Sequence, residues 1–296
     1  MPSLKDLRDR IDSVQSTKKI TSAMKLVAGA RLKKAQTEAE SSRPYASKMQ
    51  TIIDNVTSNI SNLENAPEII KGKENNKTHL IVLMTSDRGL CGGFNTAITK
   101  MAKKKIKNIK NSSKNVKILC VGKKGYDHLK REFNDSIIDS IPISSQKKID
   151  YEFAAKISNK ILLMYQNEEF DVAHTVFSLF KSAIKQEAQL KQIIPVLTDV
   201  ENTQKKDENK NDEIYEYEPE EEEVLKNLVP QNVAIQIFSG LLENAAGEQG
   251  ARMTAMDNAT RNAGELIDTL RLNYNRSRQA QITKELIEVI SGAEAV

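Results

Sequence analysis

Apolar residues recur at helical spacing from the start of the chain. Ser3 followed by Asp6 is a variant of the capping box, and no Gly or further Pro interrupts the pattern before Gly29. The spacing alternates between three and four residues, which predicts a long helix with a coiled-coil seam. Pro44 is expected to kink or end this helix, although helical periodicity resumes beyond it. The seam comprises Leu4, Leu7, Ile11, Val14, Ala28, Leu32 and Ala35, with polar Lys18, Thr21 and Lys25 in its middle.

The same segment has a second apolar face. At about 100° per residue, Ile20, Met24 and Val27 project from the side roughly opposite the seam. A helix with two apolar faces needs a second helix and a further surface around the pair, and the alternative is a helix buried in a core. Numerous cations argue against burial, so we expect an acidic protein surface nearby. These cations are Lys18, Lys19, Lys25, Arg31, Lys33 and Lys34.

A second helical pattern spans about Val224 to Ile290. Its stripe comprises Met256, Ala259, Ala263, Leu266, Leu270 and Tyr274. Nearby glycines, at a cost of about 1 kcal/mol each in helix propensity, permit close backbone approach; they are Gly240, Gly247, Gly250 and Gly264. Near the end, Ile282, Leu286 and Val289 point one way, while Ile287 and Ile290 point another. An end that is apolar on several sides indicates insertion into a pocket of another molecule.

The middle of the chain follows a different pattern. The β-branched runs "THLIVLM" and "VKILCVG" flank an amphipathic, lysine-rich segment, which predicts a βαβ unit. A helix, a strand, a helix and two strands follow, the last strand being "QIIPVL". A strongly acidic and polar block then indicates an exposed connection. We predict four parts: an N-terminal helix over 1–63, an inserted α/β domain over 78–200, an acidic connection over 201–223 and a C-terminal helix over 224–296.

Composition limits the class of protein. The 296 residues include 39% apolar and 5% aromatic residues and no Trp, which predicts a thin core and an elongated part. The net charge of +4 hides blocks of opposite sign and identifies no partner. Cys91 and Cys120 lie in separate apolar contexts, which favours buried thiols in a reducing compartment. No apolar run approaches about 20 residues and no signal peptide is visible, so we expect a soluble protein or one peripheral to a membrane.

The segment "TSDRGLCGGFN" raises the question of an active site. Its glycines match neither the dinucleotide fingerprint nor the Walker A loop. As a nucleophile, Cys91 would need a histidine, but His79, His128 and His174 are in no recognisable signature and lack metal-ligand spacing. We therefore expect no catalytic, cofactor-binding or metal-binding residue, and we interpret the segment as a tight strand-to-helix turn with a buried thiol.

Two other classes compete with a binding or structural role. A nucleic-acid binder is disfavoured, because the chain lacks a reading motif and interleaved aromatic residues, and its acidic connection would repel phosphate. A small α/β enzyme with helical interaction arms stays open as the alternative.

Three segments carry a resemblance to a known family. "LRDRIDSVQSTKKITSAMKLVAGARLKKAQ", "TSDRGLCGGFN" and "NATRNAGELIDTLRLNYNRSRQAQITKELIEVISGAEAV" resemble the gamma subunit of F-type ATP synthase, as does "YEYEPEEEEVLKNLVP". The resemblance implies a long antiparallel coiled coil of the N- and C-terminal helices with an inserted Rossmann-like α/β domain. It also implies a rotor shaft without catalytic residues. The shaft would stand inside a ring of alpha and beta subunits and would be turned by a proton-driven c-ring. A helix of about 60 residues would extend about 90 Å, enough to thread such a ring.

The resemblance further implies partner-contact residues. Those expected to meet the beta subunits are Met24, Lys25, Arg252, Arg278, Gln279, Thr283 and Glu285. Arg88 and the Cys91 loop are weaker candidates. Tyr215, Tyr217 and Glu218 resemble the contact with the c-ring, with the epsilon subunit docking nearby. The expected location is peripheral, on the cytoplasmic face of the inner (plasma) membrane.

Overall fold

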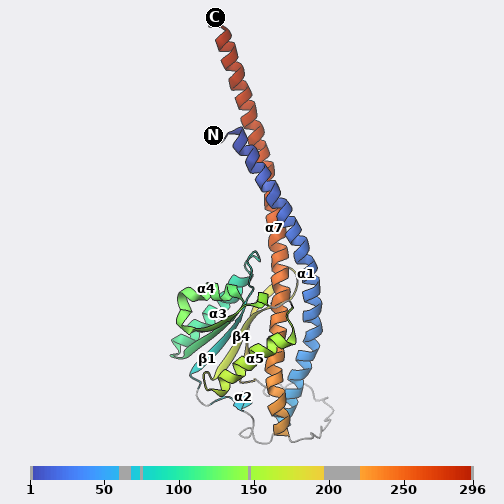
Figure 1. The fold of residues 1–296 in the computed structure, drawn as a ribbon, viewed down its shortest axis with the longest axis vertical. Coiled ribbons are helices and arrows are strands. Elements are labelled where there is room, and N and C mark those ends of the chain that lie inside the picture. Colours follow the sequence, from blue (N-terminus) through green and yellow to red (C-terminus); the bar gives the residue numbers. More distant parts are fainter. Residues whose placement is uncertain (1–2, 60–67, 74–75, 146–147, 197–220, 295–296) are drawn as a thin grey trace, which may run out of the picture. The chain divides into compact units, whose positions relative to one another are not determined.

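Two long helices form the ends of the chain, and a mixed α/β segment lies between them in sequence. The computed structural model describes residues 3–59, 68–73, 76–145, 148–196 and 221–294. Helix α1 spans Leu4–Asn59 and helix α7 spans Glu221–Glu294 (Figure 1). This confirms the predicted fold class, with long terminal helices and an inserted α/β domain.

The start of the first helix was predicted correctly, but the effect of Pro44 on it was not. At its start, the Ser3 backbone N–H donates to the Asp6 carboxylate and the Asp6 N–H donates to the Ser3 hydroxyl, both at 3.1 Å, which confirms the capping box. At Pro44 the expectation of a helix end is wrong, because Pro44 lies inside α1. A proline removes one backbone hydrogen bond, but burial of Ile53 and Val56 further along holds the later turns in place.

The described residues of the inserted segment form a five-stranded sheet. Its strands are β1 Thr78–Met84, β2 Asn115–Val121, β3 Ile137–Ile141, β4 Val172–Phe180 and β5 Gln186–Ile194. The strand order is β3-β2-β1-β4-β5; β1 to β4 run parallel, and β5 pairs antiparallel with β4. This parallel core with crossover helices is Rossmann-like.

Helices cover both faces of the sheet. They are α3 Phe94–Asn111, α4 Lys123–Phe133 and α5 Tyr151–Gln166, and the shorter elements are α2 Glu68–Lys71, η2 Asn134–Ser136 and η3 Ile143–Ser145. Ile81 and Leu83 of β1 pack on the side of α3 and α4, while Leu80 and Val82 pack with α5 and α7. Burial on both faces explains why the β1 and β2 segments are almost continuously apolar.

The last strand begins earlier than predicted. The sequence indicated "QIIPVL", whereas β5 runs from Gln186 to Ile194 and ends immediately before Pro195. β5 is an edge strand and pairs with β4 within the described sheet, so its residues 186–189 are only half-buried, Leu190 and Lys191 are exposed, and most of these positions carry polar residues. An edge strand of this kind lacks the apolar run that marks a buried strand.

Most of the predicted glycines of α7 lie against the α/β domain and not against α1. A Cβ on Gly247 would lie 3.0 Å from the Phe94 ring, and one on Gly240 would lie 3.2 Å from the Met84 sulfur. Gly264 alone of the four predicted glycines faces α1, where a Cβ would lie 3.1 Å from the Lys18 Nζ. Close backbone approach was therefore predicted correctly, but its main partner is the α/β domain.

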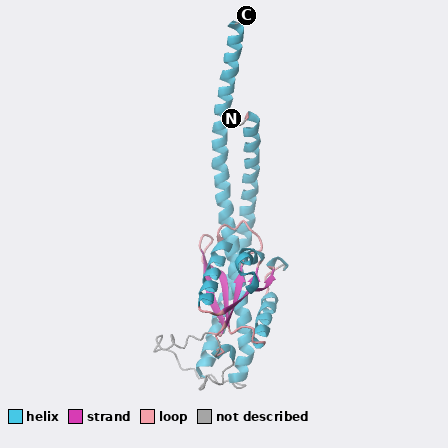
Figure 2. Ribbon diagram, turned by 90° about the vertical axis from the view of Figure 1, so that its left-hand side faces the viewer, coloured by secondary structure: helices cyan, strands magenta, loops and turns pink. Residues whose placement is uncertain are grey.

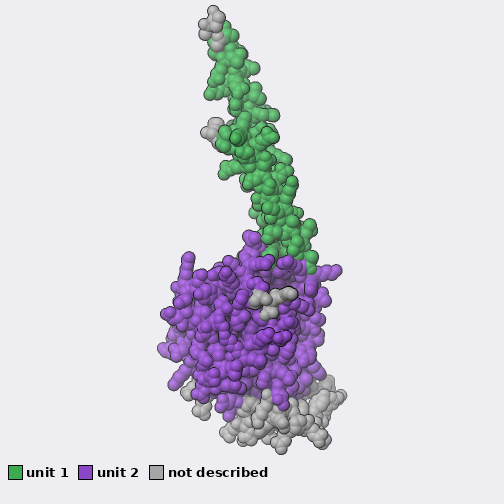
Figure 3. Space-filling model, in the orientation of Figure 1, with its two compact units in different colours: residues 1–30, 252–296 green, residues 31–251 purple. Residues whose placement is uncertain are grey.

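The chain divides into two units (Figure 3). The helical unit comprises residues 1–30 and 252–296, and the α/β unit comprises residues 31–251. Within the described ranges, no helix combines the length and the apolar character that crossing a bilayer requires.

Candidate functional site

The glycine-containing turn after β1 is closed by one asparagine. Asn95, at the start of α3, accepts a hydrogen bond from the Ser86 backbone N–H at 3.0 Å and donates to the Ser86 hydroxyl at 2.8 Å. It also lies 3.3 Å from the Cys91 sulfur, and Cys91 is only 2% exposed. The polar groups of the turn therefore bind one another around a buried thiol, in agreement with the structural interpretation. Sequence reasoning did not single out Asn95, whose position two residues after the glycine pair was the available signal.

Both cysteines are buried and reduced. Cys120 lies in β2 and is fully buried, and burial raises the pKa of its thiol to about 12. A thiol held in its neutral form is a poor nucleophile and a poor metal ligand. Among the described residues, no group of three or more His, Cys, Asp or Glu side chains could hold a metal ion.

Two of the three histidines lie side by side under α3. The rings of His79 in β1 and His174 in β4 are 5.7 Å apart, and each side chain is more than nine-tenths buried. Burial, followed by the charges of Lys105 and His79, lowers the pKa of His174 to about 3. Burial also lowers the pKa of His79, assisted by Lys114 and Lys105 and opposed by Asp171.

The α/β unit is therefore expected to lose stability as the pH falls below about 6.5, the ordinary histidine pKa. The fold favours the neutral ring, so this stabilisation is complete above that pH and is lost progressively toward pH 3. For His174 alone the loss between pH 7 and pH 5 is about 2 kcal/mol. Urea unfolding of the full chain at both pH values measures this loss in the free energy of unfolding. His174→Leu should flatten the dependence of that free energy on pH, and His128→Gln, at an exposed position, should leave the dependence unchanged. An unaltered slope in His174→Leu would contradict this assignment.

The helical unit is an antiparallel pair of helices (Figure 2). The Thr260 hydroxyl donates to the Thr21 hydroxyl at 2.8 Å, and the Lys25 ammonium binds the Asp257 carboxylate at 2.6 Å. Residue numbers in these pairs add up to 281 or 282, as expected for one antiparallel register. The polar gap in the predicted seam is thus where polar side chains join the two helices.

Lys25 is held by its partner helix. The hydrogen bond from Lys25 lowers the pKa of the Asp257 carboxyl group, and Arg261 lies 3.5 Å from the same carboxylate. The Lys25 and Asp257 side chains remain 43% and 36% exposed. The pair therefore presents a fixed ammonium and a fixed carboxylate at the surface of the helical unit.

The second apolar face of α1 points outward. Ile20 is 60% exposed and Val27 is 52% exposed, while Met24 between them is half-buried. Ala28 of the seam, by contrast, is 1% exposed. Within the helical unit, only the seam side of α1 is covered by α7 in this stretch.

The stripe on α7 needs one correction. Leu266 was predicted to belong to it, but Leu266 is 47% exposed and Ile267 is 5% exposed. The buried positions Met256, Ala263, Ile267 and Leu270 are spaced by seven, four and three residues, which is the heptad spacing of a supercoiled pair. The predicted stripe and the observed seam share Met256, Ala263 and Leu270. They differ between the last two of these, where the prediction took a step of three residues to Leu266 and the structure takes a step of four to Ile267.

The C-terminal end of α7 continues past its partner. The register places Leu4, where α1 begins, opposite residue 278, so α7 residues beyond that point have no α1 segment beside them (Figure 1). Predicted contact residues Arg278, Gln279, Thr283 and Glu285 lie in or next to this segment and are all exposed. Five large apolar side chains there are 51% to 71% exposed: Ile282, Leu286, Ile287, Val289 and Ile290.

The remaining predicted contact residues have different surroundings. Arg252 is half-buried in α7 at the start of its helical-unit segment. Arg88 contributes its backbone carbonyl to the glycine-containing turn, where it accepts from the Ser86 hydroxyl at 2.7 Å. Tyr215, Tyr217 and Glu218 lie outside the residues that the structure describes.

Together these features define a class of protein, a subunit of a larger assembly. Its two terminal helices pair with each other, apolar side chains on the outer face of α1 and at the end of α7 are exposed, and the polar groups of the turn after β1 bind one another. Comparison with known proteins identifies the family within this class.

The family model described as "ATP synthase" matches residues 3–296. The ATP synthase gamma chain of Pelagibacter ubique is 52% identical over 296 residues, and that of Rhodospirillum rubrum is 52% identical over 299 residues; both alignments cover all of each chain. The chain belongs to the gamma chain family of F-type ATP synthases. It is a non-catalytic subunit with the central-stalk role, so the alternative of a small α/β enzyme is set aside.

Solved structures show the same fold. A Tetrahymena thermophila mitochondrial ATP synthase central stalk and c-ring structure contains a chain with a TM-score of 0.60 and 26% identity, over 81% of this chain and 99% of that one. A Euglena gracilis mitochondrial ATP synthase structure contains one with a TM-score of 0.69 and 19% identity, over 99% of this chain and 94% of that one.

Proposed function

We propose that this chain is the rotating shaft that couples proton-driven c-ring rotation to ATP synthesis or hydrolysis on the alpha and beta subunits. One observation carries the proposal: the exposed apolar end of α7, where five large side chains face solvent in the isolated chain. Contiguous apolar surface of this kind marks an interaction site, because exposure to water is unfavourable. A ring of alpha and beta subunits around α7 would cover these side chains on all sides.

The coupling follows from asymmetry. An off-axis pair of helices contacts three chemically identical catalytic subunits differently at any instant, so each orientation favours a different set of open and closed sites. Nucleotide binding at those sites then biases the angle of the helices by the same free energy, because linkage is reciprocal. The same complex can therefore synthesise ATP or be driven by ATP hydrolysis.

The proposed contacts with the beta subunits lie on both helices of the helical unit. Met24 and Lys25 contribute from α1, and Arg252, Arg278, Gln279, Thr283 and Glu285 contribute from α7. The ion pair with Asp257 supports a positional role for Lys25, because it holds the ammonium at one point on the surface. Exposed charges give orientation-dependent attraction that is short-ranged enough to break at each step.

The other partner contacts rest on the family resemblance. We propose that Tyr215, Tyr217 and Glu218, which lie outside the described residues, contact the c-ring, and that the epsilon subunit docks nearby. The four-part division at 1–63, 78–200, 201–223 and 224–296 is likewise kept as a proposal. The complex would hold the chain at the cytoplasmic face of the membrane, as a peripheral subunit.

Met24→Lys tests the contact surface. The new cation would lie next to Lys25 in sequence and on the outward face of α1, so it should change the interaction free energy between the helical unit and the beta subunits more than the stability of the fold. We expect ATP hydrolysis or proton pumping to change at least about fivefold, equivalent to about 1 kcal/mol of coupling free energy. Both activities are measured together in a reconstituted complex.

A matched variant separates position from charge. Asn108→Lys adds the same cation at an exposed site on α3 and should leave both activities at wild-type levels. Wild-type hydrolysis and pumping in Met24→Lys would rule out the proposed contact.

A further inference from the structure

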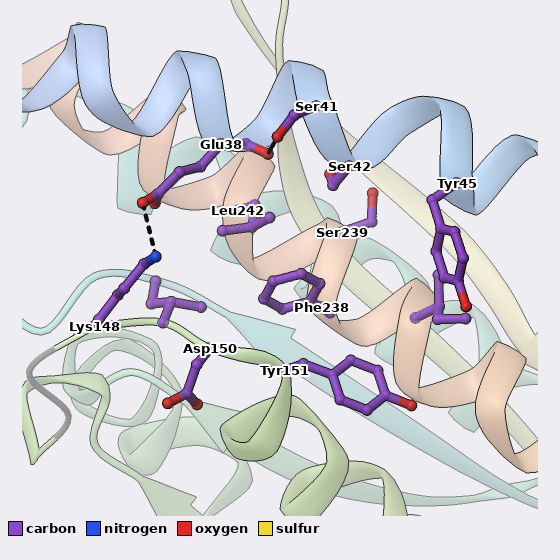
Figure 4. Close-up of a pocket in the computed structure, with 12 residues that line it drawn as sticks. Glu38, Ser41, Ser42, Tyr45, Lys148, Asp150, Tyr151, Phe238, Ser239 and Leu242 are labelled. Carbon is purple, nitrogen blue, oxygen red and sulfur yellow. Dashed lines mark hydrogen bonds and ion pairs between the residues drawn. The ribbon is translucent and has the colours of Figure 1, made fainter.

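A cavity of about 440 Å³ lies within the α/β unit (Figure 4). It is bounded by α1, by α7 and by the segment that leads into α5. Phe238 and Leu242 of α7 form its middle, and Tyr45 and Tyr151 lie together at one end. Sites for small molecules commonly measure about 300 to 1,000 Å³ and are lined mainly by apolar and aromatic side chains. The cavity has the size and the lining of such a site.

Most polar groups in the wall are already engaged. The hydroxyls of Ser41 and Ser42 donate to the carbonyls of Glu38 and Ala39 on their own helix, at 3.0 and 2.8 Å. Asp150 caps α5 by accepting from the Phe153 backbone N–H at 2.9 Å. With these groups occupied, the wall offers a ligand mainly carbon surface.

The end opposite the tyrosines is ionic. The Lys148 ammonium lies 3.2 Å from the Glu38 carboxylate, as the dashed line in Figure 4 marks. A second hollow of about 200 Å³ shares both of these residues and continues toward Arg31 and Lys34 of α1. The apolar cavity therefore opens, past one ion pair, onto a basic hollow.

The charges of the basic hollow are not balanced locally. Arg31 and Lys34 are exposed, and neither has an ion-pair partner among the residues that the structure describes. Among the residues that line this second hollow, Lys148 offsets Glu38 and two cations remain. This combination favours a ligand with an apolar body and one anionic group.

We propose that the two hollows form one binding site for a single-chain alkyl carboxylate. The carboxylate binds Arg31 and Lys34, and the alkyl chain passes the Glu38–Lys148 pair and lies on Phe238 and Leu242. Ion-assisted hydrogen bonds position the head group, and burial of methylene groups supplies the affinity. This site is separate from the partner contacts of the helical unit, so its failure leaves the proposed rotor function untouched.

Photoaffinity labelling tests the site directly. The probe is hexadecanoic acid with a diazirine in its chain, applied to the full chain and to the assembled complex, with the labelled peptides identified by mass spectrometry. We expect labels on segments 38–45, 148–151 and 235–242, and at least about tenfold less labelling with the methyl ester, which lacks the anion. Unlabelled acids from eight to sixteen carbons should compete up to about fourfold better per added methylene until the cavity is full.

Variants of the head-group site provide the matched comparison. Arg31→Glu with Lys34→Glu should reduce labelling at least about tenfold, because two cations become two anions. Lys104→Glu with Lys107→Glu makes the same charge change on exposed positions of α3 and should not alter it. The exposed head-group variant is expected to fold, and circular dichroism checks this. Ser239→Trp, which fills the cavity, should abolish labelling of all three segments.

Several results would overturn the proposal. These are equal labelling by the acid and its methyl ester, or labelling that survives both the head-group and the Ser239→Trp changes. If the free acid did not label the chain and only a diazirine phospholipid in vesicles did, the ligand would not be a single-chain carboxylate. Labelling of the free chain that disappears in the assembled complex would mean that a protein partner covers the hollows instead.

Discussion

Replacing Arg43 by methionine is expected to destabilise the α/β unit by about 3 kcal/mol. Arg43 of α1 binds Glu243 of α7 through two guanidinium nitrogens, at 2.6 and 3.0 Å. The Glu243 side chain is only 3% exposed, so the substitution leaves a buried carboxylate without its counter-charge. Breaking a buried pair in this way costs about 3 to 5 kcal/mol, and the lower value applies because Arg43 itself is 44% exposed.

The pair also anchors both helices to the sheet. Arg43 donates to the Phe180 carbonyl at 2.8 Å, and Glu243 accepts from the Phe180 backbone N–H at 2.9 Å. The hydrogen bond to Glu243 raises the pKa of the Arg43 guanidinium, so the guanidinium stays charged at any physiological pH. Three elements, α1, α7 and β4, thus meet at one ion pair.

Urea unfolding of the full chain measures the effect. Arg43→Met combined with Glu243→Gln should recover part of the loss, because glutamine can still accept from Phe180 and carries no charge. Lys156→Met is the matched control, since it breaks a fully exposed pair with Glu152 on α5 and should leave the stability almost unchanged. Equal losses in Arg43→Met and Lys156→Met would show that burial of Glu243 is not decisive.

Gly122→Ala is expected to cost about 3 to 5 kcal/mol, the sum of backbone strain and overpacking. Gly122 joins β2 to α4 with φ of 103° and ψ of 132°, a conformation that essentially only glycine adopts. An added Cβ would overlap the Thr85 carbonyl oxygen and lie 2.7 Å from the Thr85 carbonyl carbon. Both neighbours are backbone atoms, so no side chain can rotate away to relieve the contact.

The strain at Gly122 should affect the whole sheet. Its N–H donates to Ile141 at 2.8 Å, and the neighbouring Thr85 N–H donates to Val121 at 2.8 Å. Gly89→Ala is the matched control, because Gly89 has a negative φ and no atom within 4 Å of an added Cβ. Thermal unfolding should show a large fall in Tm for Gly122→Ala and little change for Gly89→Ala; equal shifts would refute the steric explanation.

Local signals in the sequence account for most of the fold. The capping box at Ser3, the β-branched runs of β1 and β2, and the buried context of Cys91 are read from neighbouring residues, and all three agree with the structure. The edge strand β5 was misplaced because an exposed strand carries no apolar run. Pro44 did not end α1, because burial of later turns outweighed one lost hydrogen bond.

The candidate site was predicted unevenly for a related reason. Motif resemblance supplied Met24 and Lys25, but no local pattern connects Lys25 with Asp257, which is 232 residues away in sequence. The same limit applies to the clamp at Arg43, whose partner Glu243 is 200 residues distant. The cavity at Phe238 depends on three separate segments and has no signature in any one of them.

By itself, then, the sequence determined where helices and strands form, which faces of them are apolar, and the family to which the chain belongs. Periodicity and capping act over a few residues and are visible in any window of that size. Only the tertiary structure decided which polar residues pair across the helices, which glycines contact the sheet, and where apolar and basic hollows adjoin. Those outcomes depend on the antiparallel register of α1 and α7, and distant segments acquire a register only when the chain folds.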